Sequence, residues 1–269
     1  MAATVLQLSD THLVADPAGR PHGRYPGRRL AAVIAAARAA GPVDLVLLTG
    51  DVTDDASVGA ARRAAELIAP LGAPVLAVPG NHDRGPELEE VFGPPAPAEL
   101  AGWTVVAVSS RLPGRVEGAV DPAAVLGLLD DAGARPALLA LHHPPAGPSS
   151  HGWFQLGGAG ELLAGLDRRP QVRLVVSGHL HQPFEVVSGG RTTLGAPSTL
   201  YALRHDGDAW EPDDTVACGA RLLRLGPEGE WSSELIPLGA GVDAEVGAGR
   251  GEPGGAGQGR PGASGEGRR

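Results

Sequence analysis

The sequence contains no lysine, a single cysteine and few aromatic residues. Its 22 basic residues other than histidine are all arginine, which excludes a Schiff-base lysine and a P-loop lysine. Cys218 has no partner for an intramolecular disulfide and no second thiolate for a zinc or iron–sulfur cluster. Because aromatic residues make up only 3% of the chain, leucine, valine, isoleucine and alanine must fill the core.

An excess of positive charge and a long apolar run are also missing. The net charge is −9, which disfavours non-specific nucleic-acid binding, because that binding depends on cationic neutralisation of phosphates. No apolar run approaches the roughly 20 residues of a membrane-spanning helix. The segment from Met1 to Leu8 lacks the basic start of a secretory signal. We therefore expect a cytoplasmic protein that neither crosses a membrane nor binds nucleic acid.

Short apolar runs alternate with alanine-rich segments over the first two thirds of the chain. The predicted strands are Thr4–Leu8, Leu45–Leu48, Val75–Val78, Thr104–Val108, Ala137–Leu141 and Leu174–Val176. The predicted helices are Arg28–Ala40, Ser57–Ile68, Pro122–Leu129 and Glu161–Leu166. Alternation of strand and helix predicts an α/β sheet fold.

The pattern changes after Ser177, where strands follow one another without a helix. These predicted strands are Phe184–Val187, Arg191–Leu194, Arg221–Leu225 and Trp231–Ile236, and their short Gly-containing turns indicate an antiparallel region. The acidic segment from His205 to Asp214 shows no pattern that can be assigned. From Gly239 onward the chain has almost no large apolar residue. We expect one domain over residues 1–238 and a Gly-rich disordered tail over residues 239–269.

Clusters of Asp, Asn and His directly follow five of the predicted strands. They lie in Ser9–His12, Thr49–Asp54, Pro79–Asp83, His142–Pro145 and Ser177–His181. In open α/β sheets, ligands bind outside the carboxyl ends of the strands. The five clusters therefore predict one convergent site.

Each cluster alone has a plainer interpretation. Asp51 or Asp54 could cap the helix that starts near Ser57, and Asn81 could hold a left-handed turn. His179 and His181 are the hardest to explain by structure, because alternate residues of an extended chain face the same side. The five clusters together favour a metal site over these separate explanations.

The candidate ligands offer carboxylate oxygen, amide oxygen and imidazole nitrogen, a mixture that suits Mn, Fe or Zn. One ion would leave ligands unused, whereas two ions about 3.5–4 Å apart would use them if one carboxylate bridges. Gly50 lets the backbone approach closely, so Asp51 is the candidate bridge. With Asp10, Asp51 and a hydroxide, two divalent ions would keep a charge of about +1, which attracts phosphate.

These motifs, in this order, resemble the calcineurin-like metallophosphoesterase superfamily. They are Asp-x-His at 10–12, Gly-Asp-x-x-Asp at 50–54, Gly-Asn-His-Asp at 80–83, a histidine at 142 and Gly-His-x-His at 178–181. Finer features are similar to the class III cyclic nucleotide phosphodiesterases. These features are the runs 9–13, 50–55, 142–145, 178–181 and 196–199, together with the closing strands. The resemblance covers roughly Thr4 to Leu238.

The resemblance implies a four-layer α/β/β/α sandwich with a dinuclear metal site at the C-terminal ends of the strands, and a homodimer. The implied ligands of the first metal are Asp10, His12, Asp51 and His181. Those of the second are Asp51, Asn81, His142 and His179. The implied catalytic residues are His82, which faces the substrate, and Asp54, which orients His82. Pro144 favours an extended His143, so we expect the rings of His142 and His143 to point apart.

We predict a metal-dependent phosphodiesterase that hydrolyses a small phosphodiester such as 3′,5′-cyclic AMP by attack of a metal-bound hydroxide. The alternatives to this prediction are a phosphomonoesterase acting on a nucleotide or sugar phosphate, a nuclease, and a metal-free binding scaffold. Asp55 replaces the Arg that phosphoprotein phosphatases of this superfamily carry, which disfavours a phosphoprotein substrate. Specificity is expected in Ala15–Gly27 and Ser110–Val120. Arg24, Arg84 and Arg111 could contact phosphate, although a solvated surface role is commoner for each.

Overall fold

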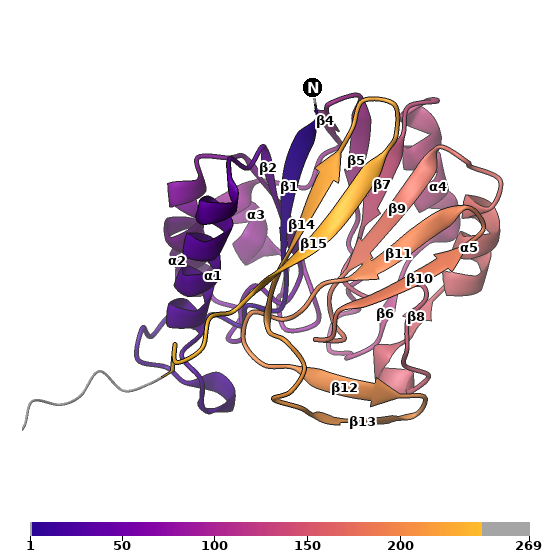
Figure 1. Cartoon of the computed structure of the whole chain (residues 1–269). Coiled ribbons are helices and arrows are strands. Elements are labelled where there is room, and N and C mark those ends of the chain that lie inside the picture. The colour runs from indigo at the N-terminus through magenta and orange to yellow at the C-terminus, as the bar shows by residue number, and fades with distance from the viewer. Residues whose placement is uncertain (1, 244–269) are drawn as a thin grey trace, which may run out of the picture.

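The computed structural model describes residues 2–243 and contains two mixed β-sheets packed face to face (Figure 1). The first sheet has the order β15-β14-β1-β2-β3. Its strands are β1 (Ala3–Leu8), β2 (Leu45–Thr49), β3 (Val75–Val78), β14 (Gly219–Leu225) and β15 (Trp231–Pro237). The second sheet has the order β10-β11-β9-β7-β5-β4. Its strands are β4 (Ala98–Leu100), β5 (Trp103–Ala107), β7 (Ala137–Ala140), β9 (Val172–Ser177), β10 (Phe184–Ser188) and β11 (Arg191–Gly195).

Helices cover the outer face of each sheet. Helices α1 (Pro26–Ala40), α2 (Val58–Ile68) and α3 (Pro86–Phe92) flank the first sheet, and α4 (Pro122–Asp131) and α5 (Ala159–Leu166) flank the second. Single 3₁₀ turns lie at η1 (Pro21–Gly23), η2 (Ala69–Leu71) and η3 (Gly152–Phe154). This arrangement confirms the predicted α/β/β/α sandwich.

The apolar runs form strands because both faces of each sheet are buried. In β2, Leu45 and Leu47 face the second sheet, whereas Val46 and Leu48 pack beneath the helices. Trp103 is fully buried in the layer between the sheets. The core is otherwise aliphatic, as the composition requires. None of the helices in residues 2–243 combines the length and apolar character needed to cross a membrane.

Local sequence sets where the helices begin. The Ser57 side chain accepts a hydrogen bond from the backbone amide of Ala60 and caps α2, so the capping role considered for Asp51 and Asp54 is wrong. Asp121 caps α4 in the same way, and Pro122 stands in its first turn. Pro86 occupies the first turn of α3, where the missing N–H costs nothing.

Two short pairs of strands lie outside the main sheets. Strands β12 (Leu203–Asp206) and β13 (Ala209–Pro212) form an antiparallel hairpin inside the acidic segment that had no assignable pattern. The two-residue loop Gly207–Asp208 is a known hairpin signal. Figure 1 shows this hairpin below the main sheets, beside the loops that follow their strands. The other pair is β6 (Gly118–Ala119) with β8 (Leu156–Gly157), which run parallel.

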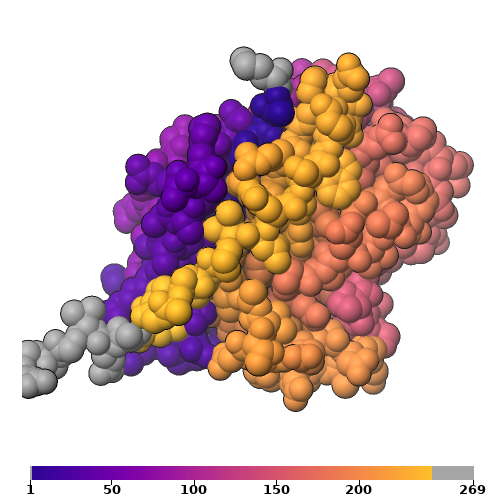
Figure 2. Space-filling model, in the orientation of Figure 1, coloured from indigo at the N-terminus to yellow at the C-terminus, as the bar shows by residue number. Residues whose placement is uncertain are grey.

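The chain crosses from β15 back to α1 before the described part ends. The Asp243 carboxylate accepts hydrogen bonds from Arg29 at 2.6 and 2.9 Å, and Leu238 donates its amide to the Cys218 carbonyl. Figure 2 shows this segment in yellow, running down from the sheet toward the indigo helices. The first five residues of the expected tail therefore have defined positions, and residues 244–269 lie outside the described residues.

Candidate metal centre

The loops after β1, β2, β3, β7 and β9 are tied to one another at one edge of the sandwich. The amides of Asp10 and His12 donate to the carbonyls of Gly50 and Asp51, at 3.0 and 2.9 Å. The Gly178 amide donates to the His142 carbonyl at 3.0 Å, and the amide of His179 contacts both carboxylate oxygens of Asp10 at 3.2 Å. The five polar clusters thus converge, as the sequence predicted.

The backbone at this edge adopts a conformation that side chains normally avoid. Positive φ angles between 45° and 69° occur at five of the predicted ligands, namely Asp10, His12, Asp51, His179 and His181. Each such residue costs on the order of 1–3 kcal/mol and persists only where its surroundings hold it. The strain is concentrated on the residues that would hold metal.

The first predicted set of ligands forms one buried group. Asp10, His12, Asp51 and His181 each offer one ligand atom, and these atoms lie within 4.8 Å of one another. All four side chains are at most 4% exposed. Nε2 of His181 lies 3.3 Å from Oδ1 of Asp10, and Nε2 of His12 lies 3.9 Å from Oδ2 of Asp51.

The tautomers of these histidines follow from their outer partners. His12 donates Nδ1–H to Asp54 at 3.0 Å, and His181 donates Nδ1–H to the Tyr201 carbonyl at 3.0 Å. Both Nε2 atoms then carry a lone pair, and they lie 3.3 Å apart. Two facing lone pairs repel each other, and a cation between them relieves the repulsion. The group therefore fits a divalent metal ion.

The second predicted set lies on the other side of Asp51. Nε2 of His142 is 3.4 Å from Oδ2 of Asp51 and 3.2 Å from Oδ1 of Asn81. His142 donates its Nδ1–H to the Thr49 carbonyl at 2.7 Å, which leaves Nε2 free. His179 donates Nε2–H to the Trp153 carbonyl at 3.0 Å and leaves Nδ1 free. These nitrogens and the Asn81 oxygen are the candidate ligands of a second divalent ion. His142 and His179 also form a buried group with His143, in which one ligand atom of each residue lies within 4.8 Å of the others.

Asp51 takes part in both groups. Its Oδ2 faces the nitrogens of His12 and His142, and its Oδ1 accepts the His82 amide at 2.8 Å. Burial raises the pKa of the Asp51 carboxyl, but the nearby His142 and His12 lower it further, so it lies well below its ordinary value. An ionised carboxylate between two cation sites is what a bridging ligand requires.

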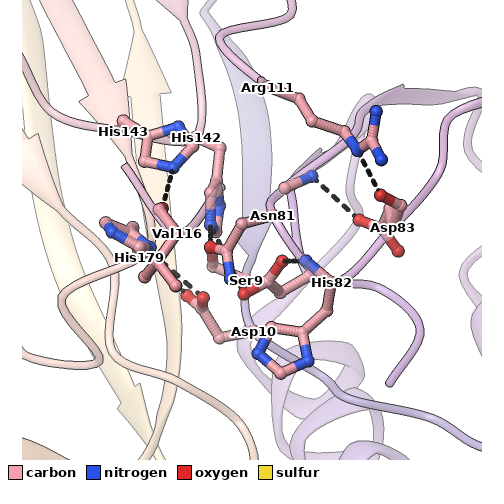
Figure 3. Close-up of polar contacts among 12 residues, drawn as sticks. Ser9, Asp10, Asn81, His82, Asp83, Arg111, Val116, His142, His143 and His179 are labelled. Carbon is pink, nitrogen blue, oxygen red and sulfur yellow. Dashed lines mark hydrogen bonds and ion pairs between the residues drawn. The ribbon is translucent and has the colours of Figure 1, made fainter. Parts of the chain in front are cut away.

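His143 lies closer to His142 than expected. The two rings meet edge to face with centroids 4.8 Å apart, so the expectation that they point apart is wrong. Figure 3 shows His143 contacting Val116, whose carbonyl accepts Nε2–H at 2.9 Å, and its Nδ1 accepts the Ser110 hydroxyl proton at 2.8 Å. Burial and the neighbouring His142 lower the pKa of His143 to about 3. With both nitrogens engaged, neutral His143 supports the ligands around it.

His82 and Asp54 stand beside the first group. Asp54 Oδ1 accepts from Nδ1 of His12 at 3.0 Å and contacts Nδ1 of His82 at 3.2 Å. The hydrogen bonds from His12 and His82 lower the pKa of Asp54, and Asp54 in turn raises the pKa of His82. The His82 side chain is 37% exposed, whereas the predicted Asp and His ligands are buried. It faces the cavity with Nε2 free.

Asp83 organises the site, although its role was not recognised from the sequence. Its carboxylate accepts hydrogen bonds from the amides of Val52, Thr53 and Gly80 and from the Thr53 hydroxyl, at 2.8–3.2 Å. It thereby joins the loops after β2 and β3, which carry Asp51 and Asn81. Burial and the Asp51 charge raise its pKa to about 6. The available signal was its place in the Gly-Asn-His-Asp motif.

A cavity of about 190 Å³ opens over the metal centre. Its lining includes Asn81, His82 and His179 and four aromatic residues: Trp153, Phe154, Tyr201 and Trp210. These aromatic residues were also missed, because their convergence depends on loops and on a hairpin that the sequence did not predict. Within residues 2–243, no arginine lines this cavity.

The three arginines considered for phosphate binding lie elsewhere. Arg24 pairs with Asp214 at 2.7 Å and borders a separate cavity of about 410 Å³ beside the segment 237–243. Arg84 and Arg111 border another cavity, and Arg111 donates to the Asp83 carbonyl (Figure 3). The structure therefore favours a role outside the phosphate site for these three arginines over direct contact with phosphate.

Comparison with known proteins identifies the family. The model of the family described as calcineurin-like phosphoesterase matches residues 3–183, more than half of the chain. The protein therefore belongs to the calcineurin-like metallophosphoesterases.

Named relatives cover most of the chain. It is 34% identical over 244 residues to a probable cyclic nucleotide phosphodiesterase of Synechococcus sp., covering 87% of this chain and 92% of the relative. It is 34% identical over 241 residues to the 3′,5′-cyclic adenosine monophosphate phosphodiesterase CpdA of Pseudomonas aeruginosa, covering 84% and 86%. The CpdA of Escherichia coli K12 is 33% identical over 244 residues, with coverage of 86% and 88%.

Solved structures share the fold at low sequence identity. A dimetal phosphatase from Danio rerio superposes with a TM-score of 0.57 at 15% identity, over 88% of this chain and 99% of that one. A purple acid phosphatase from yellow lupin gives a TM-score of 0.62 at 14% identity, over 88% and 52%. These likenesses agree with the sandwich architecture.

Proposed function

We propose that this protein is a metal-dependent phosphodiesterase that hydrolyses a 3′,5′-cyclic nucleotide. The observation that carries the proposal is the buried group of Asp10, His12, Asp51 and His181, in which Asp51 also lies 3.4 Å from His142 of the second predicted set. The relatives named as cyclic nucleotide phosphodiesterases, at 33–34% identity, support the choice of substrate.

The residues divide between two metal ions as the family resemblance implies. Asp10, His12, Asp51 and His181 would hold the first ion; Asp51, Asn81, His142 and His179 would hold the second. Manganese, iron and zinc suit this mixture of ligands. When bound, the two ions would supply an activated water as the nucleophile and positive charge for the phosphoryl oxygens.

The side chains at the cavity then complete the reaction. Asp54 accepts the Nδ1 hydrogen of His82 and so fixes the ring, and the hydrogen bond raises the pKa of His82. A protonated His82 can donate from Nε2 to the oxygen that leaves phosphorus. Opening a cyclic diester creates one alkoxide, so one proton donor at the cavity is sufficient.

The charges at the cavity favour a diester over a monoester. A cyclic nucleotide carries one negative charge on its phosphate, whereas a phosphomonoester at neutral pH carries close to two. In the described part of the chain the cavity lining offers no arginine, and the whole sequence has no lysine. The positive charge of the ions, about +1 after their ligands are counted, matches the monoanionic diester.

Hydrolysis by the Mn²⁺-loaded protein tests this proposal. We expect 3′,5′-cyclic AMP and a bis-aryl phosphodiester to be hydrolysed faster than the matching aryl phosphomonoester, with activity abolished by EDTA. Asp51→Asn is the matched control, because it removes the shared charge at nearly constant volume. Faster hydrolysis of the monoester would establish the phosphatase alternative, and a protein without metal or activity would establish the scaffold alternative.

Two further expectations concern the whole chain. We propose that residues 1–238 form the catalytic domain, and that the protein is a cytoplasmic homodimer, as the family resemblance implies. Light scattering on the purified protein measures the dimer directly. A mass equal to the 27.2 kDa of one chain at all concentrations would contradict it.

A further inference from the structure

The cavity over the metal centre has an aromatic wall in a chain that is poor in aromatic residues. The sequence has four tryptophans, two tyrosines and three phenylalanines. Four of these nine, Trp153, Phe154, Tyr201 and Trp210, line this one cavity. Core packing accounts for Phe154 and Tyr201, which lie in a small apolar cluster with Leu180. Trp153 and Trp210 belong to none of the core clusters of residues 2–243.

Two of these rings are more exposed than large apolar groups usually are. Trp153 is 50% exposed and Trp210 is 37% exposed, whereas Trp103 in the core is fully buried. The centroids of Trp153 and Trp210 are 5.9 Å apart with the planes inclined at 47°. They form a pair that still presents aromatic surface to the cavity. Exposed aromatic surface beside a site marks a place where a ligand binds.

The two tryptophans are held in place relative to the metal ligands. Trp153 accepts a hydrogen bond on its carbonyl from His179, one of the predicted ligands. Trp210 lies on β13, and two hydrogen bonds anchor its hairpin. The Ser150 amide donates to the Gly207 carbonyl at 2.8 Å, and Nε2 of His205 donates to the Leu180 carbonyl at 2.9 Å. Figures 1 and 2 show the hairpin at the lower edge of the molecule, next to these loops. The wall is therefore a fixed part of the site.

We propose that Trp153 and Trp210 form a stacking surface for the nucleobase of the substrate, an inference that rests on the proposed phosphodiesterase function. A purine is flat, uncharged and large enough to cover an indole ring. Stacking on an aromatic side chain stabilises a bound base without requiring charged partners, which suits a cavity lined by no arginine in the described residues. The class of substrate is thus a nucleoside cyclic phosphate, and a purine offers the larger stacking area.

The test compares two cyclic phosphates that differ in the base. One is 3′,5′-cyclic AMP and the other is the six-membered cyclic phosphate of 1,3-propanediol, which has no base. We expect Trp153→Ala and Trp210→Ala each to lower kcat/KM for cyclic AMP by about 5- to 150-fold, mainly through KM. Activity on the base-free phosphate should stay within about twofold, and Phe at either position should restore most of the loss.

Val187→Ala is the matched control, because Val187 is 70% exposed on β10, outside the cavity lining. It should leave both activities unchanged. Equal loss on both substrates in the tryptophan variants, or no loss on cyclic AMP, would overturn the stacking surface while leaving the phosphodiesterase function intact.

A binding measurement separates the two proposals. Adenosine 5′-monophosphate should quench the tryptophan emission of the metal-loaded protein, and the Trp153→Ala/Trp210→Ala double variant should lose this quenching. If the wild-type protein hydrolyses neither cyclic phosphate, the proposed function is wrong, and the titration then decides on the stacking surface alone. Equal quenching in the double variant would refute it.

Discussion

At the metal centre, the partner of one ring nitrogen decides what the other nitrogen can do. His12, His142 and His181 each donate Nδ1–H to an oxygen and keep Nε2 free. His143 has both nitrogens occupied and is left without a free lone pair. Adjacent histidines therefore have different roles because Thr49 and Ser110 supply different partners. A carbonyl or hydroxyl partner of this kind cannot be identified from the motif alone.

Single-residue changes at Asp54 and His82 should have different effects, because the Asp54 carboxylate also fixes the ring nitrogen Nδ1 of the predicted ligand His12. His82→Ala removes the proposed proton donor and should lower kcat by about 10²- to 10⁴-fold while two metal ions per chain remain. Asp54→Ala also frees Nδ1 of His12, so metal affinity should fall by about 10- to 100-fold. Metal analysis and steady-state kinetics on both variants test this, and metal loss in His82→Ala would exclude the assigned role.

At the scale of elements, the buried strands were predicted well from the sequence. The six apolar runs of the first part became strands with nearly the expected limits, because a strand covered on both faces must be apolar throughout. The hairpin β12–β13 was missed because β12 has a single apolar residue, Leu203, and β13 is exposed throughout. Its Gly207–Asp208 loop was the one local indication. Consequently the convergence of the candidate ligands could be predicted, but the aromatic wall could not.

The loops between elements pack so tightly that a methyl group should not fit. A Cβ at Gly50 would lie 2.3 Å from Nδ1 of His142, and Gly50 has a φ of +92°. Gly50→Ala should therefore displace His142, reduce binding of the second metal and destabilise the fold by about 1–3 kcal/mol. Gly127→Ala is the control, because it lies within α4 with open space around it and should stabilise by about 0.5–1 kcal/mol. Chemical unfolding and metal analysis measure both, and equal effects would contradict the packing argument.

At the scale of the whole molecule, the segment after β15 connects the end of the described chain to the site. Arg29 on α1 donates to the Asp243 carboxylate and to the Leu200 carbonyl, next to Tyr201, whose own carbonyl holds His181. Asp243→Ala removes the carboxylate that pairs with the guanidinium of Arg29, which is nearly buried. Since Asp243 is itself 25% exposed, we expect a loss of about 1–2 kcal/mol in the free energy of unfolding. Asp214→Ala, which removes a far more exposed partner of Arg24, is the control and should have little effect.

The proposed metal centre would join the two sheets, because its proposed ligands come from both. Asp10, Asp51 and Asn81 follow strands of the first sheet, and His142 and His179 follow strands of the second. Ions bound only by the folded protein stabilise it by mass action, by about 2.7 kcal/mol for one site at a metal concentration 100 times Kd. Removal by EDTA should therefore lower the unfolding midpoint of the whole domain in a single transition.

The Asp51→Asn variant provides the internal comparison for this last prediction. It weakens both sites at once, so its unfolding midpoint should hardly respond to added Mn²⁺. A change in His82, which is not one of the proposed ligands, should leave the Mn²⁺ response of the wild type in place. If EDTA instead shifted only one of two separate transitions, the ions would stabilise one sheet and its helices, and the centre would not join the two halves of the sandwich.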